Sequence, residues 1–235
     1  MESFCEYTDK GNKKICRVFD KIENDITSYL IGFMACDGAF INTKYPFMAV
    51  NNTEKHIIYS FMNRYCPDKP IYNIGKNSSV KVDAINDVYL LRFPAKMNES
   101  FKKFGIFDYK SSRRFIGVKD KFLYSYIAGC IDADGFITVG HRKDCRTPRL
   151  RWFLTHGSEL FLSDLQNVLS RHDLPTTLRQ HGENAWRLQA QHTDKNKIFL
   201  WKVCSFLRNV KKNTILNNYL DKYFVPQASD ELLEP

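Results

Sequence analysis

The sequence predicts an α+β protein made of two copies of one αββαββα unit, and two observations support this prediction. The motif LIGFMACDGAF at 30–40 returns as IAGCIDADGF at 127–136, which places Asp37 and Asp134 97 residues apart. Each copy is followed by the same order of strand-like alternation and helix-like periodicity. We therefore expect two pseudo-symmetric repeats with saddle-shaped antiparallel sheets, packed through the two motif helices.

The first repeat is predicted over 25–104, after an N-terminal extension at 1–24. Its motif helix covers about 25–37, and its second helix opens with Thr53 as N-cap and Glu54 in the first turn. The other elements of this repeat are strands near 39–44, 46–51, 70–76 and 87–93 and a helix near 95–104.

The second repeat is predicted over 120–225, between a linker at 105–119 and a C-terminal tail at 226–235. Its motif helix covers about 120–134. The other elements of this repeat are strands near 136–142, 148–155, 176–181 and 185–191 and helices near 158–172, 194–208 and 212–223.

Composition favours a nucleic-acid partner. The 235 residues carry 35 Lys plus Arg against 26 Asp plus Glu, a formal net charge of +9, and an excess of this kind suits a polyanion. No stretch approaches the roughly 20 apolar residues of a membrane-spanning helix. We expect no membrane partner and an intracellular location, in a prokaryotic or phage-infected cytoplasm or in an organelle of a eukaryote.

The cysteines and histidines predict no metal cluster. Seven cysteines are widely spaced without a CxxC pair, and the six histidines form no ligand spacing suited to zinc. We expect reduced thiols that lie in the core or on the surface.

The end of each motif helix combines an aspartate with a glycine. Gly38 and Gly135 are predicted to take the left-handed conformation just past a helix C-terminus. The acids Asp37 and Asp134 would face the negative end of the helix dipole, which is unfavourable by a few tenths to 1 kcal/mol. Because this placement occurs twice, we expect a compensating cation.

Small residues predict how the two motif helices pack. Gly32 and Cys36 share one face of the first helix, and Gly129 and Ala133 share the matching face of the second. Small residues at this spacing let two helix backbones approach closely. The two terminal acids would then emerge side by side and need neutralisation, most simply by a divalent ion, with the carbonyls of Cys36 and Ala133 as further ligands.

The paired motifs resemble those of the LAGLIDADG homing endonucleases, in the single-chain form with two motifs. The second motif keeps Gly129, Asp132 and Asp134, whereas the first has Ala35 where the family usually has its first acid. The resemblance implies a site-specific endonuclease that cuts both strands of DNA with Mg²⁺ or Mn²⁺, while Ca²⁺ binds without supporting cleavage. It also implies that the last acid of each motif, Asp37 and Asp134, binds the catalytic metal.

The same resemblance implies further catalytic residues. Lys110 follows the first acid by 73 residues and Lys212 follows the second by 78, which fits the basic residue that the family places beside its active site. Asn52 and His156 map to a polar residue at a strand end that helps to place the attacking water. A turn or N-cap role fits both residues at least as well.

Strand-like stretches with Arg and Gln at every second position predict a DNA-reading surface in the second repeat. Arg and Gln side chains suit guanine and adenine edges in the major groove. The first repeat is harder to interpret. The predicted DNA contacts are Asn42, Lys44, Lys76, Lys81, Arg92, Thr138, Arg142, Arg149, Arg151, Arg179, Arg187, Gln189 and Gln191.

These features predict a monomer with pseudo-twofold symmetry on a long duplex whose two half-sites differ. One alternative is a cleavage-deficient relative of the same fold, such as an intron maturase that binds intron RNA or a transcription regulator. Ala35 favours it, and retention of both motif acids argues against it. A second alternative, an unrelated two-repeat interaction module, gives no reason for the repeated acid.

Overall fold

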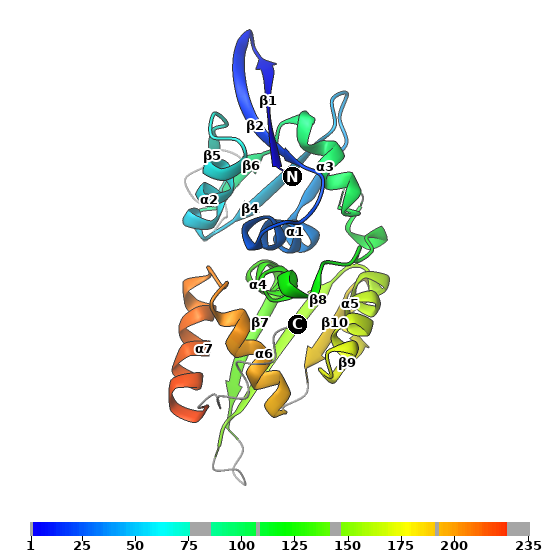
Figure 1. The fold of residues 1–235 in the computed structure, drawn as a ribbon, viewed down its shortest axis with the longest axis vertical. Coiled ribbons are helices and arrows are strands. Elements are labelled where there is room, and N and C mark those ends of the chain that lie inside the picture. Colours follow the sequence, from blue (N-terminus) through cyan, green and yellow to red (C-terminus); the bar gives the residue numbers. More distant parts are fainter. Residues whose placement is uncertain (1, 76–85, 107–108, 142–146, 191–192, 225–235) are drawn as a thin grey trace. The chain divides into compact units, whose positions relative to one another are not determined.

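The computed structural model describes residues 2–75, 86–106, 109–141, 147–190 and 193–224. The chain divides into two compact units (Figure 1). The first unit comprises Met1–Glu23 and Asp37–Tyr109, and the second comprises Asn24–Cys36 and Lys110–Pro235. The first motif helix, apart from its last residue Asp37, therefore falls in the same unit as the second repeat.

The first unit contains a four-stranded antiparallel sheet in the order β3-β4-β6-β5. Helix α2 packs on β4 and β6 of this sheet. Its elements are the strands β3 (Ala39–Ile41), β4 (Phe47–Asn52), β5 (Ile71–Asn73) and β6 (Tyr89–Arg92), the helices α2 (Lys55–Tyr65) and α3 (Asn98–Lys103), and a 3₁₀ turn at Ala95–Met97.

The second unit contains a sheet of the same topology, in the order β7-β8-β10-β9, with helices α4 to α7 around it (Figure 1). The motif helices α1 (Asp25–Asp37) and α4 (Leu123–Asp134) belong to this unit, apart from Asp37 itself. Its other elements are 3₁₀ turns at Lys110–Ser112 and Asp120–Phe122, the strands β7 (Gly135–Gly140), β8 (Arg149–His156), β9 (Thr176–Gln180) and β10 (Trp186–Ala190), and the helices α5 (Glu159–Arg171), α6 (Asp194–Cys204) and α7 (Val210–Tyr223).

The shared strand order confirms the predicted α+β fold of two αββαββα repeats. In both sheets the last strand of the repeat inserts between the second and third, so that all neighbours are antiparallel. Alternation along β8 buries Leu150, Trp152 and Leu154 and leaves the residues between them partly exposed. This alternation gives each sheet one apolar face for its helices and one outer face.

Three local predictions were wrong: the N-cap of α2 and the left-handed conformation of Gly38 and of Gly135, neither of which has a positive φ. Helix α2 has Glu54 rather than Thr53 as its N-cap, because the Asn52 side chain accepts the Glu54 N–H at 2.8 Å and delays the helix by one residue. Gly135 has an extended backbone, with φ −90° and ψ 163°. A Cβ there would lie 2.5 Å from the Cα of Ile131, so close packing rather than a left-handed turn requires glycine.

The N-terminal extension contains a hairpin that the sequence analysis did not predict. Strands β1 (Glu2–Asp9) and β2 (Asn12–Phe19) pair around a two-residue turn in which Lys10 and Gly11 both have positive φ. The Asp68 carboxylate accepts the N–H of Ile15 at 2.8 Å, which attaches the hairpin to the region after α2. No helix among the described residues is long and apolar enough to cross a membrane.

Candidate active site

The two motif helices cross at their glycines, inside the second unit. A Cβ on Gly32 would lie 2.1 Å from the carbonyl oxygen of Tyr126, and a Cβ on Gly129 would lie 2.2 Å from that of Tyr29. Tyr29 and Tyr126 are themselves 97 residues apart, like the two glycines. The contact is therefore reciprocal, and any side chain at either glycine would collide with the backbone of the other helix.

Each helix reaches its acid five residues after the crossing glycine. Asp37 is the last residue of α1 and Asp134 is the last residue of α4, and both residues are half-buried. Lys110 forms an ion pair with Asp134. The predicted lysine therefore contacts the acid of the second motif.

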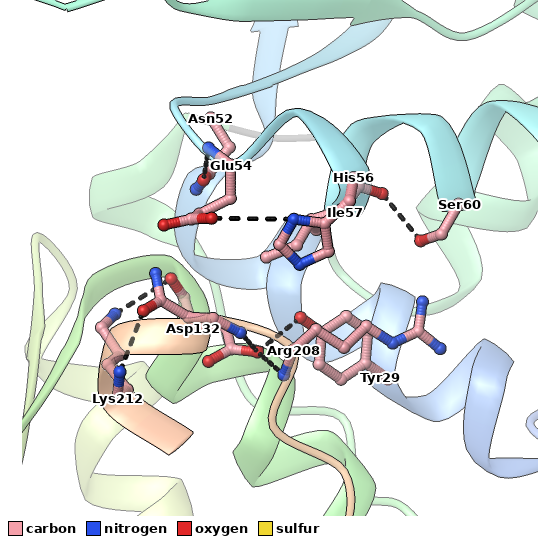
Figure 2. A network of polar contacts seen from close by, with 10 residues as sticks. Tyr29, Asn52, Glu54, His56, Ile57, Ser60, Asp132, Arg208 and Lys212 are labelled. Carbon is pink, nitrogen blue, oxygen red and sulfur yellow. Dashed lines mark hydrogen bonds and ion pairs between the residues drawn. The ribbon is translucent and has the colours of Figure 1, made fainter. Parts of the chain in front are cut away.

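Asp132, the first acid of the second motif, anchors distant segments of the second unit (Figure 2). It is 1% exposed, and its Oδ2 accepts the Tyr29 hydroxyl at 2.7 Å and the Arg208 and Asn209 backbone N–H groups at 2.6 and 3.1 Å. Burial raises the pKa of the Asp132 carboxyl, and these three donors oppose that shift. The first motif has Ala35 at the equivalent position, so this anchoring exists in one motif only.

Basic side chains hold the carbonyl ends of both motif helices. Lys212 donates to the carbonyl of Asp132 at 3.0 Å (Figure 2) and to the carbonyl of Ile131 at 2.6 Å. The buried Arg113 donates through Nη1 to the carbonyls of Met34 and Ala35 at 3.2 and 2.7 Å. These are equivalent carbonyls of the two motifs, and a cation there compensates the negative end of the helix dipole.

Arg113 is the functional candidate that the sequence analysis missed. By its contacts it corresponds to Lys212, whereas Lys110 was predicted to be the counterpart. Arg113 follows Asp37 by 76 residues, closer than Lys110 to the 78-residue offset in the second repeat. The matching offset would have identified Arg113 if arginine had been considered as well as lysine.

His156 and Asn52 make the contacts expected of the turn alternative. The His156 Nε2–H donates to the carbonyl of Ala35 at 3.1 Å, and its Nδ1 accepts the N–H of Ser158 at 2.9 Å. Burial lowers the pKa of His156 from 6.5 to about 4, so the ring is neutral at pH 7. Because both ring nitrogens are engaged, His156 has no free position for a water in this arrangement.

The residues predicted as metal ligands fit magnesium chemistry better than a closed metal cage. The described residues contain no group of three or more His, Cys, Asp or Glu side chains that could hold an ion. Mg²⁺ is usually held by one or two carboxylates, with waters and substrate phosphates completing its shell. Oxygen donors of this kind are also what the expected ligands offer, the carboxylates of Asp37 and Asp134 and the carbonyls of Cys36 and Ala133.

Nine of the thirteen predicted DNA contacts are among the described residues, and these nine lie on the outer faces of the sheets and in one adjoining loop. In the second sheet, β7 and β8 pair Thr138 with Arg151, and β10 and β9 pair Arg187 with Arg179. Arg149, Arg151, Arg187 and Gln189 are half-buried, Thr138, Arg179 and Arg92 are exposed, and Asn42 and Lys44 lie in the exposed segment between β3 and β4. Lys76, Lys81, Arg142 and Gln191 lie outside the described residues.

Comparison with known proteins finds similarity in structure alone. No family model and no curated protein matches the chain. A structure of I-SmaMI, bound to an uncleaved DNA target in the presence of calcium ions, has TM-score 0.50 and 12% identity and covers 89% of this chain and 96% of that one.

Two further structures have lower scores. Variants of the homing endonuclease I-DmoI have TM-score 0.49 and 16% identity, covering 77% of this chain and 96% of that one. The LAGLIDADG meganuclease I-AabMI, bound to uncleaved DNA, has TM-score 0.45 and 14% identity, covering 88% of this chain and 87% of that one. With its two repeats and paired motif helices, this chain has the fold of the LAGLIDADG homing endonucleases, in the single-chain form with two motifs.

Proposed function

We propose that this chain is a homing endonuclease that hydrolyses both strands of a long, pseudo-palindromic DNA site with a divalent metal. One observation carries the proposal. Two helices cross within backbone contact at Gly32 and Gly129, and each ends five residues later on an aspartate. An acid at the negative end of a helix is unfavourable, so its presence in both repeats supports a shared chemical use.

The carboxylates of Asp37 and Asp134 would hold the metal, together with the carbonyls of Cys36 and Ala133. When bound, a divalent ion activates water and stabilises the charge that develops on the attacked phosphate. Lys110 keeps a positive charge in contact with Asp134. A phosphate oxygen brought to this carboxylate would therefore meet a second cation.

Arg113 and Lys212 would position the acids rather than touch the substrate. Each holds the carbonyls two and three residues before its acid, so each limits the movement of a helix end. The carboxylates then need little reorganisation when metal and substrate arrive.

The outer face of the second sheet supports DNA as the partner. Its four strands contain Arg149, Arg151, Arg179 and Arg187 and no acidic residue. Such a surface attracts the phosphate backbone, and arginine and glutamine side chains can also read base edges. One chain would supply both halves of the recognition surface.

The test is cleavage of a duplex library that contains randomised candidate sites, with Mg²⁺, Mn²⁺, Ca²⁺ or EDTA. We expect double-strand cuts with Mg²⁺ or Mn²⁺ and binding alone with Ca²⁺. Asp134→Asn should reduce cleavage at least 100-fold and leave binding within a few-fold, because phosphate contacts dominate affinity. The control Asp173→Asn removes an exposed carboxylate whose residue has φ +56°, which asparagine tolerates, and should cleave normally.

The absence of any metal-dependent cut, or normal cleavage by Asp134→Asn, would contradict the proposal. A second candidate is a relative that binds DNA or RNA without cutting. The ion pair between Lys110 and Asp134 favours it, since a lysine already neutralises this acid. Selective binding of one duplex with no cut in Mg²⁺ or Mn²⁺ would support this candidate instead.

A further inference from the structure

The outer faces of the two sheets differ in chemistry. On the second sheet, the strands carry four arginines and no acid, as described above. On the first sheet, the four strands, all of them described, contain one basic residue, Arg92, and no acidic residue. If both sheets contact DNA, they cannot do so through the same interactions.

Strand register identifies the outer face of the first sheet. Met48, Val50 and Leu91 are fully buried and lie on the inner face. Their neighbours in sequence point outward, because side chains alternate along a strand. Across the sheet, Ile41 pairs with Phe47, Asn51 with Leu90, and Leu90 with Tyr72.

This outer face is largely apolar and partly open to solvent. Tyr72 is 43% exposed and Ile41 is 36% exposed, while Phe47 and Leu90 are half-buried. The Arg92 guanidinium lies 5.7 Å from the Phe47 ring centre and 5.2 Å from that of Tyr72. The single cation of these four strands therefore lies over aromatic rings.

Thymine is the base that suits such a surface. In the major groove, the C5-methyl group of thymine is the apolar feature of the base edges, whereas guanine, adenine and cytosine present donors and acceptors. Removing a methyl group from water on contact with Ile41 or Tyr72 is favourable. Strands with one cation gain little from phosphate neutralisation, so the affinity of this sheet face has to come from contacts of this kind.

We infer that the outer face of the first sheet recognises thymine methyl groups in its half-site, while the second sheet reads its half-site with arginine and glutamine. This inference rests on the proposed function and specifies its substrate. The half-site of the first unit is therefore rich in A·T pairs, and binding to it depends weakly on salt. Binding to the half-site of the second unit depends strongly on salt.

The experiment starts from the duplex that the wild-type chain selects from a randomised library in Ca²⁺. Thymidine is replaced by deoxyuridine, which lacks only the methyl group, first in one half-site and then in the other. We expect about threefold to fivefold weaker binding per replaced thymine in one half-site, the order expected for one methyl group. Replacement in the other half-site should change binding less than twofold.

Variants assign the sensitive half-site to the first unit. Tyr72→Ser and Ile41→Ser should each weaken binding to the thymine duplex and abolish the difference between thymine and uracil. The matched control Tyr59→Ser alters an exposed tyrosine on α2, 38% exposed, and should behave as wild type. Arg187→Ala should keep the uracil effect and reduce the slope of log affinity against log salt by about 1.

The outcomes separate this inference from the proposed function. If no duplex is selected, the proposed function fails. If a duplex is selected and cut, but replacing thymine by uracil leaves binding unchanged in both half-sites, only the inference fails. If sedimentation shows that the wild type is a dimer and that Tyr72→Ser is a monomer, the apolar face binds a second copy of the chain. This result would also overturn the inference.

Discussion

Acid should destabilise the second unit through His156. The side chain is 1% exposed and bonded through both ring nitrogens, to the carbonyl of Ala35 and the N–H of Ser158. Burial lowers its pKa from 6.5 to about 4, and the nearby Lys110 and Arg113 also lower it. Because the folded pKa is below the unfolded one, the neutral ring stabilises the fold fully above about pH 6.5, and this stabilisation is lost as pH falls through 4.

The size of the effect follows from the pKa difference. A difference of about 2.5 corresponds to about 3 kcal/mol of unfolding free energy. His156→Gln can still donate to the Ala35 carbonyl but does not titrate, and it should cost about 1 kcal/mol at pH 7 because Ser158 loses its acceptor.

Urea denaturation at pH 7, 5.5 and 4 measures the difference between wild type and this variant. The wild type should lose about 3 kcal/mol more than His156→Gln between pH 7 and pH 4. If both proteins lose stability in parallel, His156 does not titrate as a buried group. An NMR titration of the His156 ring in the folded wild type checks the pKa directly.

Two further substitutions test the helix crossing and the anchoring acid. Gly129→Ala should lower the unfolding free energy by about 1–3 kcal/mol, although alanine favours helix by up to about 1 kcal/mol, because its Cβ would lie 2.2 Å from the Tyr29 carbonyl. Gly140→Ala, with nothing within 4 Å of its Cβ, is the control in the same denaturation series, and equal midpoints would refute close packing. Asp132→Ala should cost about 3 kcal/mol, because it leaves the buried Tyr29 hydroxyl and two partly buried backbone N–H groups without their acceptor. The folded Asp132→Ala protein should still cleave DNA, and complete loss of cleavage below its unfolding temperature would show that Asp132 acts in the chemistry.

Sequence reasoning was accurate where the signals are local or repeated. The limits of α1 agree with the prediction of a helix over 25–37. The hydrophobic pattern of the sequence changes at Asp37 from that of an apolar helix to the alternation of a strand. The close approach of the two motif helices followed from the small residues at Gly32 and Gly129. The N-terminal hairpin was missed because its alternation lies in an extension outside the repeat.

Other features depend on which distant segments meet. Arg113 lies in a segment without helical or strand periodicity, and its contacts with Met34 and Ala35 join residues 79 and 78 positions apart. Tyr29 and Asp132 are 103 positions apart. Neither pairing follows from local sequence, because surface lysines, arginines and acids occur throughout the chain.

The sequence by itself determined that Asp37 and Asp134 end matching helices, and that each helix begins an αββαββα repeat. Periodicity and repetition contain that information, since they set which face of each element is apolar. Tertiary structure decided what the other polar residues in and around the motifs do. Asp132 anchors a loop and Arg113 holds the end of α1, because burial leaves each polar group only the partners that the packed chain brings within hydrogen-bond distance.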